Sequence, residues 1–208
     1  MATQTLYGSS IADATLTTAD DMATTTGGTE TSKTTTTSGT NTYSEVFSQG
    51  GSSTGASSIP ATPTGKGWVY NKPGAGTYAT GNWSASVTFS GSSLGTSDLT
   101  IRFFRYSSGT YTQIGTINKT GVVSAKTTYS FPATSMGTIT FAANDLLYVD
   151  LWFHDTSTIG GDNPVIYVSN SATQGVANDM VVTTSNFTPS GGGPTHRIIC
   201  DGMGGMFV

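Results

Sequence analysis

Hydrophobic and polar residues alternate along much of the last two thirds of this 208-residue chain. The alternation is clearest in segments 83–89, 99–103 and 147–153, where every second residue is apolar. Successive side chains of a β-strand point to opposite faces of its sheet, so a period of two places one set of residues in a core and the other set outside it. The pattern therefore predicts strands with one buried face.

Turn residues separate these strands at regular intervals. Gly, Ser, Asn and Pro gather between them, and Tyr-Ser-Ser-Gly-Thr-Tyr at 106–111 has the composition of a tight hairpin connection. Short strands joined in this way are typical of an all-β fold, and we expect an antiparallel β-sandwich that is jelly-roll-like. The expected strands are 67–71, 81–89, 98–106, 110–118, 126–131, 137–141, 145–154, 164–169, 180–184 and 195–200.

The first 66 residues follow a different pattern. Their apolar residues are few and isolated, and segment 24–42 consists mostly of Thr, Ser and Gly. Such a segment cannot close a core of its own. A disordered tail, a mucin-like stalk and an arm that becomes ordered against neighbouring subunits are the three interpretations. We favour the arm because Thr suits an extended, paired backbone, and predict an extended arm and linker over 1–66 followed by a β-sandwich domain with a docking C-terminal segment over 67–208.

One segment within this arm alternates. Tyr43 and Phe47 share one face of a short predicted strand that ends before two consecutive glycines at 50–51. Because both rings project from an arm without a core, we expect them to contact a neighbouring subunit.

Two further pairs of residues are predicted to lie at subunit interfaces. Tyr148 and Trp152 alternate on the strand face opposite the expected core, where an exposed aromatic stripe would be adhesive. Met206 and Phe207 belong to a C-terminal run that is apolar to its last residue, whereas free chain ends are usually polar, so we expect this run to dock either on its own domain or on a neighbouring subunit.

Charge and composition narrow the choice of partners. Eight Lys and Arg residues are scattered among twelve Asp and Glu, for a net charge of -4, which argues against a nucleic-acid partner. No apolar run approaches the length of a membrane span, so we expect no membrane partner. The first residues lack the charged and apolar regions of a signal peptide.

Candidate chemistry is sparse. Asp155 and Asp162, with backbone carbonyls, are weak candidates for binding Ca²⁺. We favour a Gly-rich turn whose Asp residues bind their own backbone, and therefore expect no metal and no cofactor. Asp150 and His154 share a strand face, but four residues separate them by about 13 Å, too far for a proton relay.

The single cysteine does not change this picture. Cys200 excludes an intrachain disulfide and a cluster of several cysteines around a metal. His196 precedes it by four residues, about 13 Å along a strand, so the two do not form a nucleophile and its base. We expect the protein not to be an enzyme.

Four segments carry a resemblance to known proteins. Asp-Leu-Thr-Ile-Arg-Phe-Phe-Arg-Tyr-Ser-Ser-Gly-Thr-Tyr-Thr-Gln-Ile-Gly at 98–115, Thr-Thr-Tyr-Ser-Phe-Pro at 127–132 and Ala-Asn-Asp-Leu-Leu-Tyr-Val-Asp-Leu-Trp at 143–152 resemble a β-sandwich domain of uncharacterised structural proteins of tailed bacteriophages and prophages. The segment at 43–51 is similar to an element that precedes that domain. The resemblance implies a virion-associated sandwich and brings no catalytic residues.

These observations together predict a non-enzymatic phage virion protein. A capsid decoration or cementing protein is the first expectation, with the arm adding strands across neighbouring subunits. We expect a homotrimer that binds the major capsid protein or another virion protein, and that is made in the host cytoplasm. The alternatives are a tail or head fibre protein that recognises a host-surface glycan, and a carbohydrate-binding or adhesin module. Such a module would stack sugars on exposed aromatic rings, but we expect Trp68, Tyr70 and Tyr78 to be buried between the sheets or at a subunit contact.

Overall fold

The chain folds into β-strands and turns, and its described part contains no helix. The expected all-β sandwich is therefore confirmed, whereas the jelly-roll connectivity stays a prediction. The structure is a computed structural model that describes residues 3–34, 41–51, 55–71, 73–91, 97–122, 125–156, 164–177 and 179–191.

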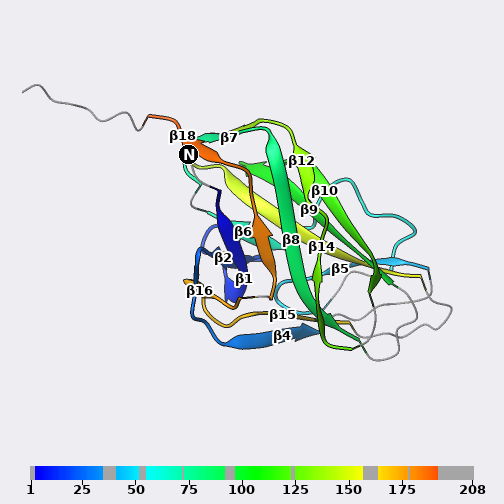
Figure 1. Ribbon diagram of the computed structural model, residues 1–208. Coiled ribbons are helices and arrows are strands. Elements are labelled where there is room, and N and C mark those ends of the chain that lie inside the picture. Colours follow the sequence, from blue (N-terminus) through cyan, green and yellow to red (C-terminus); the bar gives the residue numbers. More distant parts are fainter. Residues whose placement is uncertain are drawn as a thin grey trace, which may run out of the picture.

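Two layers make up the sandwich and can be followed in Figure 1. The first layer has the order β10-β9-β14, and the other edge of β14 pairs with both β5 and β6. Its strands are β5 (Tyr43–Val46), β6 (Trp68–Tyr70), β9 (Ser97–Ser107), β10 (Thr110–Val122) and β14 (Leu146–Asp155). The second layer is built around β8, which pairs with β15 and β17 on one edge and with β11 and β12 on the other. Its strands are β8 (Gly81–Ser90), β11 (Thr127–Ser130), β12 (Thr134–Met136), β15 (Val165–Ser169) and β17 (Val181–Thr183).

The main core lies between these layers. Phe89 of β8 stacks on Phe153 of β14 with ring centroids 5.7 Å apart, and Trp83 of β8 meets the edge of Phe103 of β9 at 5.1 Å. The apolar residues at every second position of the three alternating segments, which begin at Trp83, Leu99 and Leu147, all belong to this core. The period of two therefore identified the inward faces of β8, β9 and β14 correctly.

Most of residues 3–34 belong to the same sheet, apart from a two-residue strand that pairs elsewhere. They contribute β1 (Thr5–Ala12), β2 (Asp20–Ala23), β3 (Thr25–Thr26) and β4 (Glu30–Thr34). Strands β2 and β1 lie between β6 and β17, so they join the first layer to the second, and β4 pairs with β15. Leu6 and Met22 are buried in the main core.

The prediction of an extended arm that ends at residue 66 is therefore wrong for the described residues. Leu6 and Met22 fill a core whose other members come from much later in the chain, so the segment needs few apolar residues of its own. Its Thr and Ser residues pair through backbone groups, and this pairing takes place within the same chain.

Smaller elements complete the molecule. A three-stranded sheet covers one end of the core. There the centroid of the Tyr78 ring lies 5.2 Å from that of Trp83 and 5.4 Å from that of Phe141. The two layers also meet at the edge of the sandwich away from β1. A methyl group added at Gly115 of β10 would overlap the Met136 sulfur of β12, so the side chains there are closely packed and close this edge. The remaining strands are β7 (Gly76–Tyr78), β13 (Ile139–Phe141), β16 (Gln174–Gly175) and β18 (Phe187–Pro189).

Candidate functional site

The outer face of the first layer is covered by the chain itself. Tyr148 and Trp152 point away from the main core, as their alternation predicts, but they are only 0% and 1% exposed. The Gly67 amide donates to the Tyr148 hydroxyl at 2.8 Å, and Ala19 from the β1–β2 connection packs in the same apolar cluster. The prediction that Tyr148 and Trp152 form a subunit interface is therefore wrong, because the early segments of the same chain bury this stripe.

An ion pair lies beneath one covering segment. Arg102 of β9 and Asp150 of β14 are cross-strand neighbours, and the Arg102 Nε donates to Asp150 Oδ1 at 3.0 Å while Nη2 donates to Oδ2. Its Nη1 donates to the Pro60 carbonyl at 2.6 Å. Both side chains are almost completely buried. Arg102 therefore fixes segment 55–67 to the sheet, and its charge is balanced by Asp150.

Glu45 of β5 belongs to the same buried layer. It lies opposite Trp152, and its Oε2 accepts a hydrogen bond from the Thr64 hydroxyl at 2.7 Å. Burial raises the pKa of Glu45 to about 7; the Thr64 bond and the positive charges of Arg102 and Lys66 lower it, whereas the Asp150 carboxylate raises it. Near neutral pH this buried side chain is therefore close to half protonated.

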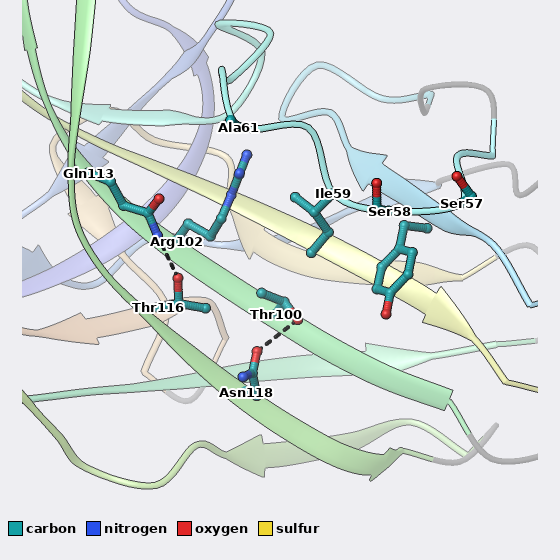
Figure 2. A pocket seen from close by; sticks show the side chains of 10 residues that line it. Ser57, Ser58, Ile59, Ala61, Thr100, Arg102, Gln113, Thr116 and Asn118 are labelled. Atoms are coloured by element: carbon teal, nitrogen blue, oxygen red, sulfur yellow. Dashed lines mark hydrogen bonds between the residues drawn. The ribbon is translucent and has the colours of Figure 1, made fainter.

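A groove of about 480 Å³ lies between segment 55–61 and the outer face of β9 and β10. Thr100 pairs with Asn118 and Arg102 with Thr116 across the two strands, so all four side chains share the groove face. Gln113 has the opposite parity, but a bulge between Gln113 and Gly115 brings it to the same side. Figure 2 shows this arrangement. The lining residues are Tyr43, Ser57, Ser58, Ile59, Ala61, Thr100, Arg102, Gln113, Thr116 and Asn118.

A second hollow of about 240 Å³ adjoins the groove and shares Tyr43, Thr100 and Asn118 with it. The Tyr43 ring stacks on the His154 imidazole, with centroids 4.0 Å apart and planes within 4°. His154 Nδ1 lies 3.9 Å from an Asp98 carboxylate oxygen. The ring of Tyr43 is therefore held in one orientation where the two hollows meet.

The other predicted site residues are distributed as follows. Phe47 is half-buried, with the Lys66 ammonium 4.4 Å from its ring centroid, and its interface role stays a prediction, as does that of Tyr43. Asp155 is buried at the end of β14, while Asp162, Met206 and Phe207 lie outside the described residues. The described side chains include no group of three or more His, Cys, Asp or Glu that could hold a metal ion. The Ca²⁺ site therefore stays untested.

Sequence reasoning identified only part of the groove. The alternation placed Thr100 and Arg102 away from the core, and Trp68, Tyr70 and Tyr78 are buried as expected. The bulge that turns Gln113 and the return of segment 55–61 over the sheet have no clear signal in the sequence. They depend on contacts between distant parts of the chain.

Comparison of the chain with protein-family models and with curated proteins finds no match. Within the described ranges, no helix is both long and apolar enough to cross a lipid bilayer.

Proposed function

We propose that the chain is a non-enzymatic structural protein of a phage virion and that it decorates the capsid as one prefolded unit. One observation carries the proposal. The segments that resemble phage structural proteins include β5, β9, β10 and β14, and these strands are hydrogen-bonded neighbours in one layer. A contiguous structural unit, rather than scattered positions, therefore underlies the resemblance.

The charged groups inside the molecule support a structural role, because they bind backbone groups of the same chain. The Arg102–Asp150 pair holds the Pro60 carbonyl. Asp13 accepts bonds from the Thr15 and Leu16 amides at 2.7 and 2.6 Å and thereby fixes the turn before β2. These charged groups brace the early segments against the sheet, which favours a rigid body.

The mode of attachment differs from bridging by an extended arm. Residues 3–34 and 43–46 already pair within their own chain, so they are not free to add strands to a neighbour. We propose instead that the surface of the folded unit contacts the major capsid protein or another virion protein, in a homotrimer, with Phe47 as a contact residue.

Co-sedimentation with capsids that lack the protein tests this proposal. The purified chain is expected to pellet with such particles up to a saturating copy number, and sedimentation equilibrium of the free protein is expected to give the mass of a trimer. Failure of the folded wild-type chain to bind any of these particles would overturn the proposed function.

A matched pair of variants tests the contact. Phe47→Asp is expected to abolish capsid binding, because it places a charge on the proposed contact surface. Ile11→Asp alters another partly exposed apolar residue, 43% exposed on β1, and is expected to leave binding unchanged. Thermal unfolding of both variants checks that the fold is retained. Equal binding by both would remove Phe47 from the interface.

A further inference from the structure

The groove over β9 and β10 has the size and shape of a ligand site. Its volume of about 480 Å³ lies within the range of small-molecule sites, about 300–1,000 Å³. It continues past Tyr43, Thr100 and Asn118 into the second hollow. A depression extended in this way suits a chain-like ligand better than a single compact one.

The floor of the groove presents oriented hydrogen-bonding groups. The Thr100 hydroxyl donates to Asn118 Oδ1 at 2.9 Å, so the Asn118 Nδ2 is directed away from this bond and offers N–H donors. Gln113 Nε2 donates to the Thr116 hydroxyl at 2.9 Å, which leaves Gln113 Oε1 as an acceptor. Figure 2 shows both pairs, with Thr100 and Asn118 on the neighbouring strands β9 and β10 and with Gln113 and Thr116 both on β10. Donors and acceptors are therefore held in fixed places along the groove.

The charges around the groove select against an anion. Among the described residues that line the larger hollow, Arg102 alone is charged, and its guanidinium is engaged by Asp150 and the Pro60 carbonyl. In the smaller hollow the Asp98 carboxylate lies near His154. A phosphate, sulfate or carboxylate would meet no excess positive charge here. The chemistry instead fits a neutral ligand rich in hydroxyl groups.

The aromatic ring of Tyr43 lies beside the polar side chains of the groove. Stacking on His154 fixes the Tyr43 ring, which lines both hollows. Aromatic rings provide rigid apolar surface, and a sugar ring carries apolar C–H groups on one face and hydroxyls around its edge. A fixed ring next to amide and hydroxyl groups therefore matches both parts of a sugar.

We propose that this groove binds a neutral oligosaccharide. Tyr43 packs against the C–H face of one sugar ring, while Gln113, Thr116 and Asn118 bond to its hydroxyls and those of the next ring. This inference goes beyond attachment to a capsid and does not depend on it, because its residues were chosen from the groove alone.

An array of neutral and acidic oligosaccharides, followed by calorimetry with chitohexaose, cellohexaose, maltohexaose and sialyllactose, tests the proposal. Binding to at least one neutral oligosaccharide is expected, with no preference for sialylated or sulfated ones. Asn118→Ala and Gln113→Ala are each expected to weaken binding of the tightest neutral oligosaccharide about two- to tenfold, the effect of one hydrogen bond. Tyr43→Ala is expected to weaken it further.

Asn186→Ala is the matched control, because it removes an exposed amide from a separate hollow of about 180 Å³ and is expected to leave affinity unchanged. Asn118 and Gln113 are exposed on β10, so their substitution is compatible with folding, which thermal unfolding verifies. The proposal is overturned if no neutral oligosaccharide binds, if only acidic ones bind, or if Asn118→Ala and Gln113→Ala bind as tightly as the wild type. Capsid co-sedimentation is measured separately, so either proposal can fail alone.

Discussion

The early strands and the long strands of the sandwich differ in length and in the number of apolar side chains that they contribute to the core. Strands β1 to β5 have two to eight residues, whereas β8, β9, β10 and β14 have ten to thirteen. The long strands supply most of the core, and the early strands supply few apolar side chains. Even so, β1 and β2 lie inside the sheet between β6 and β17. Apolar content thus indicates how much core a segment provides, and not whether it joins a core.

Hydrogen bonds give the early segments their position. The Trp68 indole donates to the Ser9 carbonyl at 3.0 Å, and the Thr18 hydroxyl donates to the Gly65 carbonyl at 2.7 Å. Asn71 donates to the Asp13 carboxylate at 2.8 Å. Such bonds contribute modestly when made, but a buried polar group left without its partner is costly. The arrangement is therefore specific as well as stable.

Removing residues 1–66 is expected to lower the stability of the fold more than any substitution. The deletion takes β1 and β2 out of the middle of the sheet and exposes the stripe around Tyr148. We expect the remaining chain to lose its cooperative unfolding transition, as followed by circular dichroism in urea, while the full chain keeps it. A truncated chain that unfolds cooperatively at the midpoint of the full chain would restore the division into an arm and a sandwich.

Arg102→Ala is expected to be the most damaging single substitution considered. It leaves Asp150 buried without its cation and frees the Pro60 carbonyl. Breaking a buried pair in this way costs about 3–5 kcal/mol of unfolding free energy. Urea denaturation measures the change.

The double variant Arg102→Met with Asp150→Leu is the control for this substitution. Because apolar residues of similar volume remove both buried charges, it is expected to lose much less stability. A single variant as stable as the double one would mean that the ion pair does not brace segment 55–67.

Leu6→Ala and Leu99→Ala compare the two regions directly. Both side chains are 0% exposed in the same core, one on β1 and one on β9. Each truncation is expected to lower the free energy of unfolding by about 2–5 kcal/mol, the usual cost of a cavity in a core. Urea denaturation of the two variants gives the comparison. A negligible effect at Leu6 beside a large effect at Leu99 would show that β1 is peripheral.

The sequence predicts the long strands better than the rest because their signal is local. In β14, Leu147 and Val149 alternate with Tyr148 and Asp150, and this pattern alone assigns the inward face. What covers the outward face depends on distant residues, such as Ala19, which no local pattern connects with Tyr148. The groove was missed for the same reason, since a bulge and a returning segment create it.

The pH dependence of stability tests the smallest of these effects, which is the contribution of the buried Glu45 carboxyl. The pKa of Glu45 is raised to about 7 in the folded protein, above its ordinary value of 4.5, so the folded state binds more protons between these values. The stability that this group contributes is fully present below pH 4.5 and is lost as the pH rises through 7, a change of about 3 kcal/mol.

Glu45→Gln should remove that component, and urea denaturation of both proteins at pH 5 and pH 8 measures it. Burial also raises the pKa of Asp179, to about 6, and this contribution remains in both proteins, so the difference between them isolates Glu45. Because Glu45 accepts its bond from Thr64, a wild-type protein that loses no more stability than Glu45→Gln between the two pH values would mean that water reaches this carboxyl. Segment 55–67 would then cover the sheet more loosely than the long strands cover each other.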